Sequence, residues 1–442
     1  MRWPTIAKTL LFILCFTVVA FVYYQDLPNQ SLHEDEYAWI ERGGIFFQKY
    51  FLEKDFSHTA WKSYHSYDQP KLGEYLYGAW TSLYYQKSPQ QVFAETGFQE
   101  NLASYSLFSE YSPSQWWVKY QAHTPQYQFI PEKYQDAYKV IVINRYFGVV
   151  FTLALLVAIF FMGNYVGGYV TGFASFLLLA QHRLLQSGGR QAMADSMLIF
   201  FMMINFLLFA FFANKPRKNF WITISFSTFL GIWIGCATSI KLNAAMTAIL
   251  GSIWMLAIPW FQRKRNSKIV KEAFVPILVM YLTAFIVFTA LNPFVWENPI
   301  QNTLKMLSWR SQVALNMQQS VPSLAYTSPF DRILGIAEET LLPANHNQRF
   351  LPWLPDGIDV LLFILGSSFL LIQVLKREKK SLYFLWWFAG TVLFLALYLT
   401  VAFDRYFLPI IPLIGIVEAY GLVKSGESIY NGVKALFLRR KH

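Results

Sequence analysis

The chain has 442 residues, of which 55% are hydrophobic, 19% aromatic and only 14% charged. A water-soluble domain carries about 25% charged residues, so this composition excludes an ordinary soluble enzyme and indicates long segments in lipid, where a central charge is costly. The formal net charge of +11 would fit a nucleic-acid-binding protein, but the cations cluster between apolar runs, which excludes that class.

The first apolar run, at 6–24, follows a basic start and has no small-residue cleavage site after it. It is therefore expected to be an uncleaved signal anchor. The two cysteines, Cys15 and Cys236, both fall within apolar runs. They form no disulfide or metal-binding pattern and are expected to be small buried residues.

A membrane span needs about 20 apolar residues. In chain order, the predicted spans are 6–24, 142–163, 167–181, 196–213, 221–238, 243–261, 273–291, 358–375, 382–402 and 406–423. Clusters of Lys and Arg follow the fourth, sixth, eighth and tenth runs, at 215–218, 263–271, 376–380 and 439–441. With about ten spans and the N-terminus inside, all four clusters lie on the cytoplasmic side, as the positive-inside rule requires. The sequence thus predicts an all-α polytopic membrane protein with one domain over 1–442 and both termini inside.

Two long segments, 25–140 and 292–357, face outward in this topology. The first contains the aromatic stretches YAWIERGGIFFQKYF and EYLYGAWTSLYY. Such helices lie in the membrane interface or pack onto the end of the bundle, and the sequence leaves both arrangements open. The second segment is expected to shape an acceptor side, with Trp309, Arg310 and Arg349 available, or to form a cap that only packs on the bundle.

Ionisable groups recur at the outer ends of the predicted spans. In chain order they are Asp35 and Glu36 in the acidic run 33–36, Lys71 in the segment 68–72, Arg190 and Asp195 before the fourth span, Lys241 with Asn243 between the fifth and sixth, and Arg405 with Tyr406 at the tenth. Singly, an acidic run is usually a solvated surface, a cation at a helix end is usually a snorkelling anchor, and His33 is expected to be a satisfied polar residue. Their gathering on one side favours a functional site.

Carboxylates and cations at this depth suit the transfer of a sugar from a lipid-linked phosphate. An Asp or Glu can take the proton of an acceptor hydroxyl. Arg and Lys can stabilise the negative charge that grows on the departing phosphate. No nucleotide site is needed, because the lipid phosphate is the leaving group.

Five segments, HEDEYAWI, YDQPKLGEYLYG, GRQAMADSMLIFF, GCATSIKLNAA and DRYFLPIIPLI, resemble in this order the motifs of the C-type glycosyltransferases. The closest resemblance is to the protein O-mannosyltransferase and aminoarabinose transferase superfamily, which uses polyprenyl-phosphate sugars. It implies that Asp35 is the catalytic base and that Glu36 orients its neighbours. It implies donor phosphate or sugar contacts from Arg190, Asp195, Lys241, Arg405, Tyr406 and, more weakly, Lys71. The first-loop motif departs from the family pattern, because Gln69 replaces a His or Lys and Lys71 replaces the second proline.

The resemblance implies an inverting membrane glycosyltransferase (hexosyl or pentosyl) in the plasma or inner membrane, with its active site extracytoplasmic. Its expected partners are the polyprenyl-phosphate-sugar donor, membrane lipid and an acceptor hydroxyl on a glycan, lipid or protein, with no nucleic acid. No cofactor is assigned: the zinc ligands of some relatives are not evident here, and a divalent cation is left open. Two rivals remain, a lipid-linked sugar flippase or polysaccharide transporter, and a scaffold protein without chemistry.

Overall fold

The computed structural model describes residues 5–25, 27–30, 33–98, 132–214, 220–261, 267–342, 350–351 and 353–439. Within them the chain is almost entirely helical and holds no sheet, and extended segments pair only at a bridge between Ala325 and Val401. The middle of the first loop, 99–131, Arg349 and most of the predicted cation clusters at 215–218, 263–271 and 439–441 lie outside the described residues or side chains.

The α-helices are α1 (Thr5–Tyr24), α2 (Glu34–Phe47), α3 (Tyr64–Asp68), α4 (Leu72–Tyr85), α5 (Pro89–Thr96), α9 (Glu132–Gly167), α10 (Tyr169–Gln181), α11 (Arg183–Gly189), α12 (Ala194–Asn214), α13 (Phe220–Ile240), α14 (Ala245–Phe261), α15 (Ser267–Leu291), α16 (Pro299–Ser320), α17 (Pro329–Leu341), α18 (Ile358–Leu375), α19 (Lys379–Tyr398) and α20 (Ile411–Arg439). Short 3-10 turns that matter for the site are η1 (Leu27–Asn29), η5 (Leu242–Ala244), η7 (Pro322–Leu324) and η9 (Asp404–Phe407).

Seven of the described helices are long and apolar enough to cross a membrane, namely α1, α9, α12, α13, α15, α18 and α19. Helices α10 and α14 are apolar but shorter, and α20 begins with a buried apolar stretch and continues as an exposed polar helix. Each predicted span therefore overlaps a helix, which confirms the all-α polytopic fold. The number of crossings and the side on which the termini lie stay predictions.

Three predicted boundaries differ from the helix ends in the structure, and all three matter for the site. Helix α9 begins at Glu132 instead of 142, because apolarity marks only the part of a helix that lipid surrounds, whereas the helix itself continues into the polar residues before it. The last two predicted spans, 382–402 and 406–423, are helices that end at Tyr398 and begin at Ile411. The residues between them form an irregular connection that contains η9 and Arg405.

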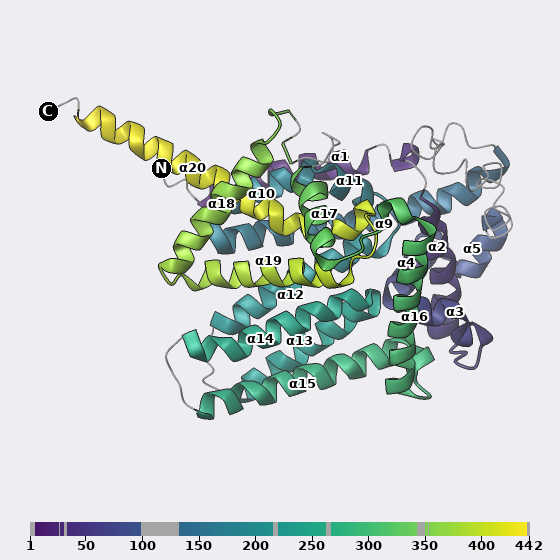
Figure 1. The fold of residues 1–442 in the computed structure, drawn as a ribbon. Helices are drawn as coiled ribbons and strands as arrows, with labels where there is room; N and C mark the ends of the chain where they lie inside the picture. The colour runs from purple at the N-terminus through teal and green to yellow at the C-terminus, as the bar shows by residue number, and fades with distance from the viewer. Residues whose placement is uncertain are drawn as a thin grey trace.

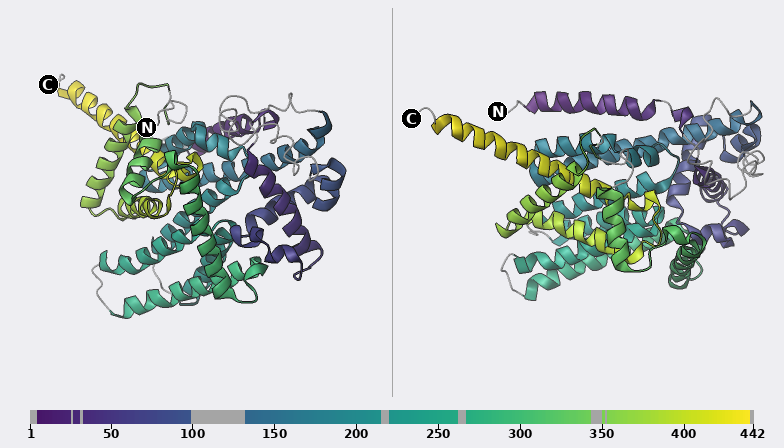
Figure 2. Two further views of the ribbon diagram at one scale, coloured as in Figure 1. Left: turned by 45° about the vertical axis from the view of Figure 1, so that its right-hand side comes forward. Right: turned by 45° about the horizontal axis from the view of Figure 1, so that its top comes forward.

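The helices form a bundle, and the helices of the first long segment, α2, α3, α4 and α5, form a cap at one end of it (Figure 1). Helices α13, α14, α15 and α19 run side by side, while α16 and α17 run crosswise to them. Helices α2, α3 and α5 lie at one end of this bundle and the two chain termini lie at the opposite end, in all the views (Figure 2). The cap and the connection that carries η9 therefore hold the charged residues away from the end with the termini.

Helix α2 is held by close backbone packing against α4. A Cβ atom added to Gly78 would lie 2.3 Å from the carbonyl oxygen of Gly43, and one added to Gly43 would lie 2.5 Å from the carbonyl oxygen of Glu74. Only glycine allows this approach. Helix α4 in turn packs on α9 and α13, so these aromatic helices pack onto the end of the bundle, one of the two arrangements that the sequence allowed.

Candidate active site

The acidic motif forms the first turn of α2. His33 caps this helix: its Nδ1 accepts a hydrogen bond from the backbone N of Asp35 (3.1 Å), and its backbone N donates to Oε2 of Glu36 (3.0 Å). This reciprocal capping box fixes the turn, and the Asp35 carboxylate lies where a helix N-terminus favours negative charge. His33 thus acts as a helix cap, in line with a satisfied polar residue.

Asp35 contacts a residue from the far end of the sequence. Its Oδ2 accepts a hydrogen bond from Nη1 of Arg405 in η9. Burial raises the pKa of the Asp35 carboxyl, but Arg405, His33 and Lys241 together outweigh burial and hold that pKa below its ordinary value. Asp35 is therefore ionised at neutral pH, and about a third of its side chain remains exposed.

Glu36 is fully buried and forms an ion pair with Arg145 in α9, which is fully buried as well. Arg145 donates Nε to Oε1 of Glu36 (2.8 Å) and Nη2 to Oε2 (2.7 Å). The remaining donor, Nη1, reaches the backbone oxygens of Leu27 (3.0 Å) and Gln30 (2.8 Å) and the hydroxyl of Tyr138 (3.0 Å). One guanidinium therefore joins α2, α9 and the segment that follows α1.

Sequence reasoning missed Arg145. It lies inside the predicted span 142–163, directly after Asn144, and so interrupts an apolar run with two polar residues. An ionisable residue at such a position is by default functional, and this signal could have identified it. The pairing with Glu36, 109 residues earlier, has no signature in the sequence.

A second charge pair lies where α12 begins and α13 ends. Nζ of Lys241 lies 2.6 Å from Oδ1 of Asp195. The other carboxylate oxygen of Asp195 is buried and has no hydrogen-bond partner among the described residues. Asp195 also acts electrostatically on Arg405, as Lys241 does on Asp35. The four groups therefore form one cluster of alternating charge.

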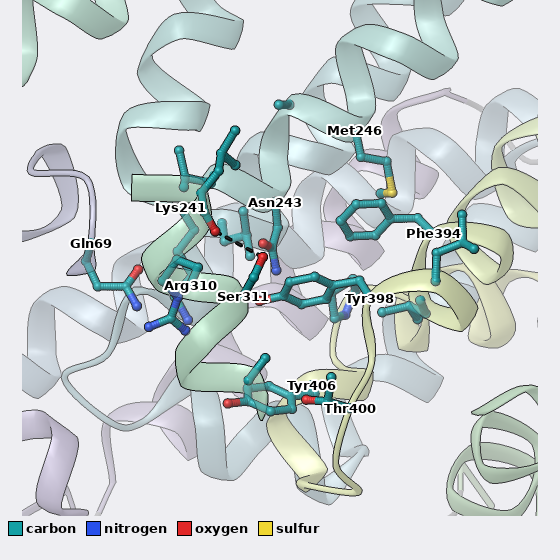
Figure 3. Close-up of a pocket in the computed structure, with 18 of the residues that line it drawn as sticks. Gln69, Lys241, Asn243, Met246, Arg310, Ser311, Phe394, Tyr398, Thr400 and Tyr406 are labelled. Carbon is teal, nitrogen blue, oxygen red and sulfur yellow. Dashed lines mark hydrogen bonds between the residues drawn. The ribbon is translucent and has the colours of Figure 1, made fainter. Parts of the chain in front are cut away.

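A cavity of about 540 Å³ opens beside this cluster (Figure 3). Three cations line its polar part: Lys241, Arg405 and Arg310. The other polar groups on its wall are Asp195, Gln69, Asn243, Ser311, Tyr398, Thr400 and Tyr406. The cavity wall thus carries more positive than negative charge, which suits an anionic ligand.

The rest of the cavity is apolar and lies between α14, α16 and α19. Its walls include Met246 and Phe394, which Figure 3 shows on one side of the space, and Leu315 of α16. Ile249 and Leu397, also on this wall, are 54% and 65% exposed. Because exposed apolar side chains of a membrane helix face lipid, this part of the cavity adjoins the bilayer.

Arg310 belongs to a charge network that joins α16 to the cap. Its Nη1 lies 2.8 Å from Oδ1 of Asp68, and the other oxygen of Asp68 lies 3.4 Å from Nη1 of Arg42. Nε of Arg42 in turn lies 3.3 Å from Glu74. Arg310, one of the residues expected on an acceptor side, thus lies on the cavity wall and is held there by the cap.

Lys71 does not line the cavity. It is buried, and its Nζ donates to Oε2 of Glu74 (2.8 Å) and to the backbone oxygen of His65 (2.6 Å), 4.2 Å from the centre of the Phe46 ring. Burial lowers the pKa of Lys71 to about 8. Gln69 faces the cavity in its place, so the structure gives Lys71 a role inside the cap.

Arg190 does not line the cavity either. It donates Nη2 to the backbone oxygen of Gln25, at the end of α1. Two residues further on, the backbone N of Ala192 donates to Oε1 of Glu36 (2.8 Å). Arg190 therefore lies next to the acidic motif, whereas Asp195, five residues further on, pairs with Lys241.

Of the predicted site residues, the structure brings Asp195, Lys241, Arg405 and Tyr406 to the cavity wall and places Asp35 against Arg405. Glu36 lies behind Asp35 in a buried pair. Among the described residues, no group of three or more His, Cys, Asp or Glu side chains is placed to hold a metal ion. The roles of all these side chains stay predictions.

Comparison with known proteins finds a matching family model and a similar fold. Residues 85–304 match the family model of dolichyl-phosphate-mannose-protein mannosyltransferase. No curated protein matches the chain. Among solved structures, the archaeal oligosaccharyltransferase AglB from Archaeoglobus fulgidus, in complex with an inhibitory peptide and a dolichol-phosphate, is similar with a TM-score of 0.53 and 12% identity. That match covers 96% of this chain and 51% of AglB.

ArnT from Cupriavidus metallidurans, bound to undecaprenyl phosphate, matches with a TM-score of 0.49 and 14% identity over 95% of this chain and 60% of ArnT. This chain therefore spans between half and three fifths of the length of these two proteins.

Proposed function

Because residues 85–304 match the family model of dolichyl-phosphate-mannose-protein mannosyltransferase, we propose that the chain transfers a sugar from a polyprenyl-phosphate donor to an acceptor hydroxyl, with inversion. The observation that carries this proposal is the position of Arg405, which contacts Asp35 and also lines the cavity. A carboxylate that can act as a base thus lies directly behind a cation that can hold a leaving phosphate.

The cavity fits a ligand with an anionic head and an apolar chain. Lys241, Arg405 and Arg310 line its polar part, and apolar residues of α14, α16 and α19 line the part that adjoins lipid. A polyprenyl phosphate has this form. We assign its phosphate to Lys241 and Arg405, and its sugar to the space beside the free oxygen of Asp195 and the Tyr406 ring.

The reaction needs one displacement at the anomeric carbon. The acceptor oxygen attacks this carbon from the face opposite the phosphate, its proton passes to Asp35, and the bond between the carbon and the phosphate oxygen breaks. Polyprenyl phosphate leaves with the bonding electrons, and Lys241 and Arg405 stabilise its charge. A single attack from the opposite face inverts the configuration at that carbon.

Arg405 couples donor binding to the strength of the base. In the structure Arg405 forms an ion pair with Asp35 and lowers the pKa of this carboxyl, which makes the carboxylate a weak base. A donor phosphate on the cavity side would share the same guanidinium and so raise the pKa of Asp35. The base thus becomes stronger when the donor is in place, a pKa change that favours proton transfer near neutral pH.

The pH dependence of transfer tests this coupling. In the free enzyme the pKa of Asp35 lies below its ordinary value, so kcat/KM, which reports the free enzyme, should stay constant as the pH falls from 8 to about 5. Arg405→Gln removes the main group that lowers this pKa and leaves the effect of burial, which raises it. The acid limb of kcat/KM should therefore move to higher pH, and Tyr406→Phe, which keeps every charge, should not move it.

In the wild-type protein, the acid limb of kcat, which reports the donor-bound enzyme, should lie at higher pH than that of kcat/KM. An acid limb that stays in place in Arg405→Gln would contradict the assignment of Asp35 as the base under the control of Arg405.

The overall proposal is tested by reconstitution. The full-length protein in vesicles, given a synthetic polyprenyl-phosphate sugar and extracts that contain candidate acceptors, should release polyprenyl phosphate and form a glycosylated product. A flippase would move the intact donor across the bilayer without releasing phosphate, and a scaffold protein would do neither. Chemical analysis of the product identifies sugar and acceptor together. We place this activity at the extracytoplasmic face of the plasma or inner membrane.

A further inference from the structure

Helix α17 carries an apolar face that the described part of the chain does not cover. The helix begins with a capping box between Ser328 and Asp331. Its buried residues are Gly335, Ile336 and Thr340. Phe330, Ile333 and Leu334, in contrast, are 65%, 44% and 46% exposed.

The exposed apolar residues form a stripe with helical spacing. Phe330, Ile333 and Leu334 lie on one face of the helix, and the half-buried Ala337 continues it. Asp331 and Glu338 share a narrow polar edge between this stripe and the buried Gly335. The helix therefore has three faces: one against the protein, one apolar and one charged. A helix at a lipid surface has this distribution.

The protein surface next to the stripe faces lipid. Helix α17 packs on α19, a candidate membrane span, and runs crosswise to it (Figure 1). Nη1 of Arg332 donates to the backbone oxygens of Ala396 (3.1 Å) and Leu397 (2.8 Å), which lie in the last turn of α19. Leu393 and Leu397 are 60% and 65% exposed on the same span. The stripe thus continues a surface that already contacts the bilayer.

The segment that leads into α17 is joined to the active site. The backbone N of Tyr326 donates to the oxygen of Thr400 (3.0 Å), and that of Ala402 donates to the oxygen of Leu324 (2.8 Å). Thr400 lines the cavity, and the connection continues from Ala402 into η9 and Arg405. A displacement of α17 therefore moves the segment that carries the phosphate-binding cation.

We propose that α17 is an amphipathic anchor whose apolar stripe inserts into the lipid leaflet at the site's end of the bundle and sets the depth of Arg405 relative to the headgroups. The occupant of this surface is the boundary between phospholipid headgroups and acyl chains. The proposed lipid contact follows from the structure of α17 and does not depend on the proposed function. Its effect on catalysis rests on the proposed function, because the depth of Arg405 matters only if Arg405 binds a lipid-linked phosphate.

Spin labels on the two exposed faces test the lipid contact. Ile333→Cys and Glu338→Cys, which lie about 140° apart around the helix, are made in the full chain with Cys15→Ala and Cys236→Ala, labelled with a nitroxide and reconstituted in vesicles of phosphatidylcholine and phosphatidylglycerol. The label at 333 should be more accessible to oxygen, which dissolves in lipid, than to a water-soluble nickel chelate, and the label at 338 should show the reverse. A label at 333 that the chelate reaches freely, or that neither reagent reaches because protein covers it, would overturn the proposal.

The effect on catalysis needs a separate measurement. The double variant Phe330→Gln/Leu334→Gln should raise the KM for a long-chain donor several-fold in vesicles while kcat changes little, and the difference should disappear in detergent with a short-chain donor. Ile300→Gln, an equally exposed apolar site on α16, is the matched control and should leave KM unchanged. An unchanged KM in the double variant would refute the role in donor binding. If wild-type protein shows no transfer but the labels report lipid, the proposed function fails and the anchor stands.

Discussion

Replacing Asp35 with asparagine is expected to reduce the rate of sugar transfer by about 10²–10⁴-fold, the range that a positioned general base contributes. Asparagine has the same size and retains an oxygen that Arg405 can contact, but it cannot take a proton from the acceptor hydroxyl. The measurement is kcat for polyprenyl phosphate release in vesicles at a saturating donor concentration.

The same variant should bind the donor at least as tightly as the wild-type protein. Arg405 loses its charged partner, so its full charge is available to the donor phosphate. Asp136→Asn, at an exposed residue that pairs with Lys139, is the matched control and should transfer sugar normally. Asp35→Asn with an unchanged melting temperature and near-normal kcat would remove Asp35 from the role of base.

Breaking the pair between Glu36 and Arg145 is expected to have the largest effect on stability. In Arg145→Met the Glu36 carboxylate stays fully buried and loses its two hydrogen bonds from the guanidinium. The variant should therefore lose about 3–5 kcal/mol of stability, the cost of leaving one buried charge unpaired. The measurement is the thermal unfolding temperature of purified protein in detergent.

The double variant Glu36→Gln/Arg145→Met separates stability from positioning. It holds no unpaired charge, so much of the lost unfolding temperature should return. Its kcat should stay low and its donor KM close to normal, because the turn that carries Asp35 is no longer tied to α9 by the ion pair. If the double variant regained full activity together with its stability, the pair between Glu36 and Arg145 would only stabilise the fold and would not position Asp35.

The helices could be predicted from the sequence because apolar length is a local signal. Each run of lipid-compatible residues overlaps a helix. The boundaries differ where polarity and helicity diverge, as at the start of α9 and between α19 and α20. Most charged residues of the site could also be identified from the sequence as candidates, because few ionisable groups occur near the ends of apolar runs.

Their partners could not be predicted, because pairing depends on three-dimensional packing. Arg405 meets Asp35 from 370 residues away. Asp195 lies five residues from Arg190 in the sequence, but its ion-pair partner in the structure is Lys241, which the end of α13 brings to it. Lys71 was a candidate for phosphate binding by its position in a motif, and its burial against Glu74 follows from the packing of α2 on α4.

The contact between Asp35 and Arg405 also has a consequence for the protein during its synthesis. The carboxylate emerges from the ribosome soon after the first hydrophobic segment, whereas its guanidinium partner follows 370 residues later. Until then the proposed phosphate site lacks one of its two cations. We therefore expect that a chain interrupted before Arg405 does not consume the lipid-linked sugar.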